Sequence, residues 1–69
     1  MNLTARQLET LDFIKSYIER NRIAPSFEEI ADHLGLKSKS GVHRIIAALE
    51  QRGRIRKIPS CARAIKVLE

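Results

Sequence analysis

The 69-residue sequence predicts a small, mainly α-helical domain in which three helices are followed by a two-stranded β-hairpin. Apolar residues recur at three- and four-residue spacing in three segments, as they do on one face of an amphipathic helix. Two of these segments open with a Thr or Ser that is followed three residues later by Gln or Glu, the pattern of a helix capping box. The residues after Gly53 instead contain two β-branched runs around a proline-containing turn, which is typical of a hairpin.

The first helix is expected to start at Thr4 and to run to about Arg20. Thr4 and Gln7 form its capping box, and Leu3 can pack against Leu8 as a hydrophobic staple. The apolar stripe that we expect to face the core consists of Leu8, Leu11, Ile14 and Ile18, widened by Phe13 and Tyr17.

A short second helix is expected over residues 27–34. Pro25 holds the residue before it outside the α region, so the helix starts only after this proline. Ser26 and Glu29 form its capping box, and Gly35 is expected to end it in the left-handed conformation. The residues of this segment that we expect to pack into the core are Ile30, Ala31, Leu34 and Leu36.

The third helix, within residues 37–53, has two unlike faces. Ser38 or Ser40 can cap its start, and Gly53 is expected to end it. Helical spacing places on one face Val42, Ile45, Ile46 and Leu49. The other face carries small polar and basic residues, with no acid before Glu50: Lys39, Ser40, His43, Arg44 and Ala47. Two helices joined by a tight, Gly-containing turn form a helix-turn-helix, whose second helix enters the DNA major groove.

The hairpin is expected to place Ile55 and Ile58 on one strand and Ala64, Ile65 and Val67 on the other, with a turn over residues 59–62. A two-stranded hairpin is marginal alone, so it must pack on the helices. The complete prediction is a winged helix-turn-helix that forms one domain over residues 1–69.

The charge is divided unevenly along the chain. Residues 1–34 contain four Lys or Arg and six Asp or Glu, whereas residues 35–69 contain nine Lys or Arg and two Glu. The second half therefore carries a net charge of +7, against −2 for the first. This division favours a polyanionic partner that meets the second half. The alternative is a solvated surface with a chance bias.

Several classes of protein are disfavoured. The single cysteine, Cys61, cannot form an intramolecular disulfide and lacks zinc-site spacing, so a reducing cytoplasm is the natural setting. The polar N-terminus does not resemble a signal peptide, and no apolar run approaches the ~20 residues that span a bilayer. The serines have no evident catalytic triad and the two histidines no ligand partners, so we expect no enzyme, cofactor or metal.

The exposed face of the third helix holds the candidate DNA contacts. Arg44 is the best candidate for a bidentate guanine contact, worth roughly 1–3 kcal/mol of discrimination, with a phosphate contact as the alternative. His43 can donate to a base or to a phosphate. Gly41 either admits the groove closely or is a fraying first-turn residue, and both interpretations stay open. Lys39 lies at the helix N-terminus, where backbone N–H groups favour phosphate.

With these residues in place, the chain resembles the N-terminal DNA-binding domain of the LexA repressors of the bacterial SOS response. The segments that carry the resemblance are LTARQLETLDFI, IAPSFEEIADHLGLKSKSGVHRIIAALEQRGRI and RAIKVL. The form KSKSGVHR resembles the alphaproteobacterial branch of that family.

The resemblance implies base contacts from a helix spanning about residues 39–52, at Ser38, Ser40, Gly41, His43 and Arg44. It also implies that Arg6 and Ser60 approach phosphate. The other expected DNA-backbone contacts come from basic residues: Lys37, Lys39, Arg52, Arg54, Lys57 and Arg63.

The implied function is that of a transcriptional repressor in the response to DNA damage, bound to a double-stranded operator in the cytoplasm at the nucleoid. We expect a monomer in solution that pairs on DNA. Family members also carry a self-cleaving Ser/Lys peptidase domain, for which 69 residues leave no room, so the chain is either an excised domain or a natural stand-alone protein. The alternative function is a protein-interaction module, such as an anti-repressor or assembly factor.

Overall fold

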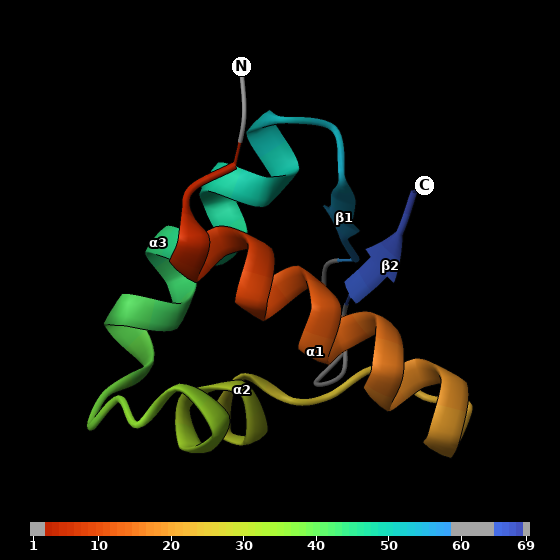
Figure 1. Cartoon of the computed structure of the whole chain (residues 1–69), viewed down its shortest axis with the longest axis horizontal. Helices are drawn as coiled ribbons and strands as arrows, with labels where there is room; N and C mark the ends of the chain where they lie inside the picture. Colours follow the sequence, from red (N-terminus) through yellow and green to blue (C-terminus); the bar gives the residue numbers. More distant parts are fainter. Residues whose placement is uncertain (1–2, 59–64, 69) are drawn as a thin grey trace.

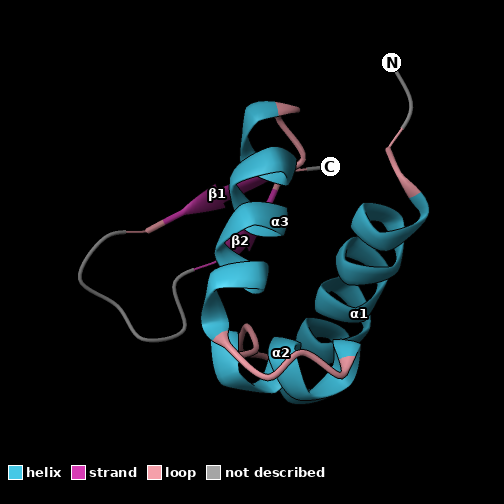
Figure 2. Cartoon of the chain, turned by 90° about the vertical axis from the view of Figure 1, so that its left-hand side faces the viewer, coloured by secondary structure: helices cyan, strands magenta, loops and turns pink. Residues whose placement is uncertain are grey.

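The computed structural model describes residues 3–58 and 65–68, and it contains three helices followed by an antiparallel pair of strands (Figure 1). The helices are α1 (Ala5–Asn21), α2 (Phe27–Leu34) and α3 (Lys39–Gln51), and the strands are β1 (Ile55–Lys57) and β2 (Ile65–Val67). Figure 2 shows α3 in front of the two strands, with α2 below it and α1 to its right. The predicted winged helix-turn-helix is confirmed. No helix among the described residues is long and apolar enough to cross a membrane.

Both predicted capping boxes are present. The Thr4 hydroxyl accepts from the Gln7 backbone N–H at 3.1 Å, and the Gln7 side chain accepts from the Thr4 N–H at 3.1 Å. The corresponding bonds between Ser26 and Glu29 measure 3.2 and 2.8 Å. The second oxygen of Glu29 accepts from the Tyr17 hydroxyl at 2.7 Å, so the start of α2 is tied to α1.

Left-handed residues end the first two helices. Gly35 has φ +71° and ends α2, as predicted, and Gly53 beyond α3 has φ +75°. Arg22 ends α1 with φ +63°, a conformation that the sequence did not predict. Its N–H donates to the carbonyl of Ile18 at 2.8 Å, so the helix is closed by a residue whose Cβ disfavours this geometry.

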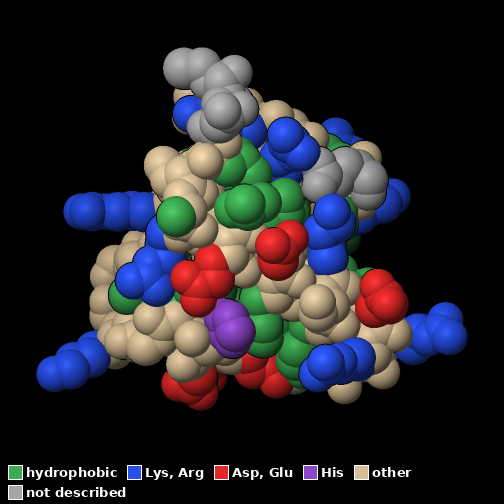
Figure 3. All heavy atoms as spheres, viewed as in Figure 1, with side chains coloured by type: hydrophobic (Ala, Val, Ile, Leu, Met, Phe, Trp, Pro, Cys, Tyr) green, Lys and Arg blue, Asp and Glu red, His purple; other side chains and the backbone are tan. Residues whose placement is uncertain are grey.

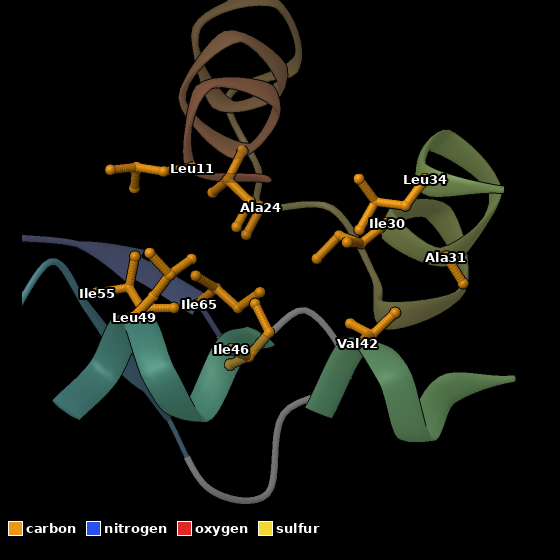
Figure 4. Close-up of a cluster of buried hydrophobic side chains, with 11 residues drawn as sticks. Leu11, Ala24, Ile30, Ala31, Leu34, Val42, Ile46, Leu49, Ile55 and Ile65 are labelled. Atoms are coloured by element: carbon orange, nitrogen blue, oxygen red, sulfur yellow. The ribbon is translucent and has the colours of Figure 1, made fainter. Parts of the chain in front are cut away.

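The core lies between the three helices and the hairpin, and Figure 4 shows its side chains converging from all of these elements. Most predicted core positions are confirmed. Tyr17 is only half-buried, and the following residues are half-buried and pack against the edge of the core: Phe13, Ile18, Leu36, Ile45 and Val67. The buried hydrophobic residues are Leu11, Ile14, Ala24, Ile30, Ala31, Leu34, Val42, Ile46, Leu49, Ile55 and Ile65.

Leu8 was expected in the core, and this prediction is wrong because its surface is 49% exposed. The buried face of α1 is centred near Ile14 and includes Thr10, whose hydroxyl donates to the Arg6 carbonyl at 2.8 Å. At 3.6 residues per turn, Leu8 points about 120° away from Ile14. Although Leu8 is only three residues from Leu11, it therefore lies beyond the edge of the buried face of α1.

The hairpin pairs Ile55 with Val67, Arg56 with Lys66, and Lys57 with Ile65. Ile58 was predicted in the first strand, but it follows β1 and is 44% exposed. The pairing ends at Lys57, whose backbone N–H donates to the Glu50 carboxylate at 3.1 Å. This bond joins β1 to the end of α3. The predicted turn over residues 59–62, Cys61 and Ala64 lie outside the described residues.

Candidate nucleic-acid interface

The position of α3 is set by its apolar face. Val42, Ile46 and Leu49 are fully buried, and α3 packs against α1, α2 and β1. The opposite side of the helix faces solvent, where Ser40, His43, Arg44 and Ala47 are exposed. Of the two faces that the sequence predicts for α3, the apolar face is therefore packed in the core and the basic face is exposed.

The start of α3 differs from the starts of the other helices. Ser38 occupies the N-cap position with extended backbone (φ −137°, ψ 158°), but its side chain makes no capping hydrogen bond. Its Oγ instead lies 3.0 Å from the Oγ of Ser40. The predicted side-chain cap is therefore wrong for Ser38, because the two hydroxyls pair with each other on the surface.

The structure shows a packing contact at Gly41 that neither of the two sequence-based interpretations included. A Cβ atom built at Gly41 would lie 3.0 Å from Leu36 Cδ1, closer than side chains normally approach. Leu36 packs against the core from the turn between α2 and α3. The missing side chain thus lets the turn pack against the first turn of α3. The predicted base contact of Gly41 stays a prediction.

His43 and Arg44 are neighbours on the exposed face. The His43 ring meets the Phe27 ring edge-to-face, with 4.6 Å between centroids and 75° between planes. Within the described residues, the guanidinium of Arg44 has neither a hydrogen bond nor an ion pair, and it extends from an exposed position. Arg44 is accordingly available to an external acceptor, whereas His43 is held by an aromatic contact.

Arg6 is partly engaged inside the protein. Its Nη1 donates to the carbonyl of Leu34 at the end of α2 (3.2 Å) and lies 3.9 Å from Glu9 Oε1. A cation at a helix C-terminus is favourable because the last carbonyls carry partial negative charge. The side chain is still 52% exposed. Arg6 therefore has an internal role in joining α1 to α2, whatever else it contacts.

The remaining predicted phosphate contacts fall at the two ends of α3. Lys37 and Lys39 are exposed at its N-terminal end. Arg52 is exposed just beyond its C-terminal end, with Arg54 half-buried behind it and Lys57 exposed on β1. The structure thus brings basic residues to both ends of α3, the helix that holds His43 and Arg44. Ser60 and Arg63 lie outside the described residues.

A groove of about 680 Å³ lies elsewhere, on the outer face of α1. Figure 3 shows this side of the molecule, where acidic side chains lie beside exposed hydrophobic ones. The groove includes Leu8 and Phe13, and the Phe13 ring stacks on His33 with 4.1 Å between centroids. His33 Nε2 lies 3.7 Å from Glu9 Oε2, so this histidine is exposed and has both an aromatic and an acidic neighbour.

A family model of the LexA DNA-binding domain matches residues 1–64, almost the whole described structure. The chain belongs to this family. It is 55% identical over 67 residues to a LexA repressor of Erythrobacter litoralis and 58% identical over 66 residues to one of Novosphingobium aromaticivorans. A LexA repressor of Cereibacter sphaeroides is 52% identical over 67 residues.

These matches cover 96–97% of this chain but only 28–29% of the relatives, so the chain spans less than a third of their length. The three organisms are alphaproteobacteria, which confirms the branch indicated by the KSKSGVHR segment. The family model that matches describes a DNA-binding domain. Among the residues that the structure describes, no three His, Cys, Asp or Glu side chains are grouped as metal ligands.

The contact of Phe27 with the exposed face of α3 was not predicted from the sequence. Phe27 was expected only as the first residue of the second helix. Its contact with His43 joins positions 16 residues apart, and helical periodicity within one segment gives no signal for a contact between two helices.

Proposed function

We propose that this chain binds double-stranded DNA sequence-specifically, with α3 in the major groove, and that it serves as the DNA-binding part of a transcriptional repressor. The observation that supports this most is the exposed face of α3. His43 and Arg44 project from a helix whose other face is fully buried, and basic residues lie at both ends. Membership of the LexA DNA-binding domain family agrees with this assignment.

The length of α3 suits the groove. Its 13 residues extend over about 20 Å at 1.5 Å per residue. The major groove of B-DNA is only about 12 Å wide. Basic side chains at both ends of α3 would thus reach the phosphates that border the groove, while the middle of the exposed face meets base edges.

The roles follow from the side-chain chemistry. Arg44 would donate two hydrogen bonds to a guanine edge, and His43 would donate to a base or a phosphate. Ser38 and Ser40 have hydroxyls that can donate to either, and Gly41 would let the groove approach the backbone. The proposed phosphate contacts are Lys37, Lys39, Arg52, Arg54, Lys57, Ser60 and Arg63.

Arg6 is also a proposed phosphate contact, although it makes a hydrogen bond inside the protein. A guanidinium has five N–H donors, and the bond to Leu34 uses one of them. Its exposed half can therefore reach a phosphate without losing the internal bond.

The relatives are named LexA repressors, and we extend that role to this chain. In this proposal it blocks an operator in the bacterial SOS response, in the cytoplasm at the nucleoid. Repressors with a helix-turn-helix bind two half-sites about one helical turn apart. The chain would be a monomer in solution and would pair on DNA.

The test is binding to two duplexes of equal length and composition over a range of salt concentrations. One duplex is the sequence that the chain selects from a random library, and the other is its scrambled form. We expect tighter binding to the selected duplex at every salt concentration, with both affinities falling as salt rises because phosphate contacts release counterions. Equal affinity for the two duplexes throughout would contradict sequence-specific repression and favour the protein-interaction alternative.

A further inference from the structure

Phe27 belongs to α2, yet its ring contacts the exposed face of α3. The centroids of Phe27 and His43 are 4.6 Å apart and their planes are inclined at 75°. Aromatic pairs favour this edge-to-face geometry because a positive ring edge meets a negative ring face. The contact therefore gives the imidazole a preferred place before any partner arrives.

Phe27 is the better anchored member of this pair. It follows Ser26, whose capping box with Glu29 fixes the first turn of α2. The Tyr17 hydroxyl holds Glu29 from α1, at 2.7 Å. The Phe27 side chain is half-buried and packs against the core, whereas His43 is exposed. The anchored ring thus sets the position of the exposed ring.

We propose that Phe27 is a positioning residue for DNA recognition, which holds the imidazole of His43 in one rotamer so that its nitrogens are presented in a fixed direction. The inference rests on the proposed function, because it takes DNA as the partner of His43. Free rotation of His43 would have to be lost on binding, at a cost in affinity. Phe27 removes that cost beforehand and restricts the bases that the imidazole can reach.

The first experiment uses the protein without DNA. NMR coupling constants give the χ1 populations of His43 in the wild-type chain and in the Phe27→Leu and Phe27→Tyr variants. Leu keeps an apolar side chain against the core but has no ring, whereas Tyr keeps the ring. We expect one dominant rotamer in the wild type and in Phe27→Tyr, and averaged rotamers in Phe27→Leu. Averaged rotamers in the wild type would overturn the inference, whatever the chain does with DNA.

The second experiment is a double-mutant cycle of Phe27→Leu and His43→Ala, measured on the selected and scrambled duplexes. Phe27→Leu should weaken binding to the selected duplex about threefold to tenfold when His43 is present, and less than about twofold when it is absent. Binding to the scrambled duplex should not change, and Phe27→Tyr should restore the affinity. The backbone amide spectrum of each variant verifies that it is folded.

The outcomes separate the two proposals. Equal losses with and without His43, or equal losses on both duplexes, would show that Phe27 only supports the fold and would overturn the inference. If the wild-type chain binds both duplexes equally, the proposed function fails instead. The rotamer populations of His43 then decide whether Phe27 positions this ring.

Discussion

The helices α1 and α2 begin with side chains that bond back to their own first turns, whereas α3 begins without such bonds. In the first half of the molecule, polar side chains mostly meet one another or the backbone: Thr4 with Gln7, Ser26 with Glu29, and Tyr17 with Glu29. In the second half, Ser38, Ser40 and Arg44 are exposed on the surface.

The net charges of the two halves, −2 and +7, follow the same division. The difference teaches that the first half uses side-chain caps to fix the starts of its helices, while α3 starts without such a cap and carries Arg44 on its exposed face. Variants that remove a polar side chain from one half or the other can test this distinction.

The largest expected effect comes from removing an exposed arginine in the second half. Arg44→Ala should weaken binding to the selected duplex about tenfold to a hundredfold, because it removes the proposed bidentate base contact. The matched control is Arg20→Ala, an exposed arginine on α1 in the first half, which should change the affinity less than about twofold. Fluorescence anisotropy with labelled duplexes measures both. Similar losses for the two variants would mean that only net charge matters.

A smaller effect is expected from comparing two N-cap serines. Ser26→Ala should lower the free energy of unfolding by about 1 kcal/mol, because it removes a capping bond that the structure contains. Ser38→Ala should change it by less than about 0.5 kcal/mol, because Ser38 caps nothing with its side chain. Urea denaturation measures both values.

The same pair of variants should show the opposite order in DNA binding. Ser38→Ala is expected to weaken binding to the selected duplex about twofold to fivefold, through loss of the one hydrogen bond to DNA that we propose for Ser38. Ser26→Ala should leave it nearly unchanged under conditions in which both variants are folded. If Ser38→Ala lowered the free energy of unfolding as much as Ser26→Ala, the two N-cap serines would stabilise their helices equally, and this would contradict the proposed difference between the two halves.

The smallest effect concerns strain at the end of α1. Arg22→Gly removes a Cβ atom from a left-handed residue, which favours the folded state, but it also makes the unfolded chain more flexible. The net expectation is a gain of less than about 1 kcal/mol in the free energy of unfolding, with unchanged DNA affinity. Thermal unfolding measures the change in stability, and fluorescence anisotropy measures the DNA affinity. A marked loss of affinity would place Arg22 among the residues that contact DNA.

Features set by short-range patterns were predictable from the sequence. The capping boxes at Thr4 and Ser26 and the left-handed Gly35 depend on residues within one turn, and the structure contains all three. The buried face of α3 was predictable because its apolar residues form a single well-defined stripe. The error at Leu8 arose because the spacing does not show where the centre of a stripe lies.

Features set by contacts between segments were not predictable. The limited space beside Gly41 comes from Leu36, which approaches it from the preceding turn. The position of the His43 ring comes from Phe27 on another helix. The side-chain cap predicted at Ser38 is absent because its hydroxyl pairs with that of Ser40, and residue spacing alone cannot rank these two competing hydrogen bonds.

The close approach of Leu36 to Gly41 limits how this protein could be retargeted to a new DNA sequence. A Cβ atom at position 41 would lie 3.0 Å from Leu36 Cδ1, so the Leu36 side chain would have to move by a few tenths of an ångström to admit it. A directed-evolution library that varies position 41 therefore has to vary Leu36 with it, whereas the exposed residues Ser40, His43, Arg44 and Ala47 can be diversified without such a partner. The choice of residue at position 41 is thus coupled to the side chain of the turn that precedes α3.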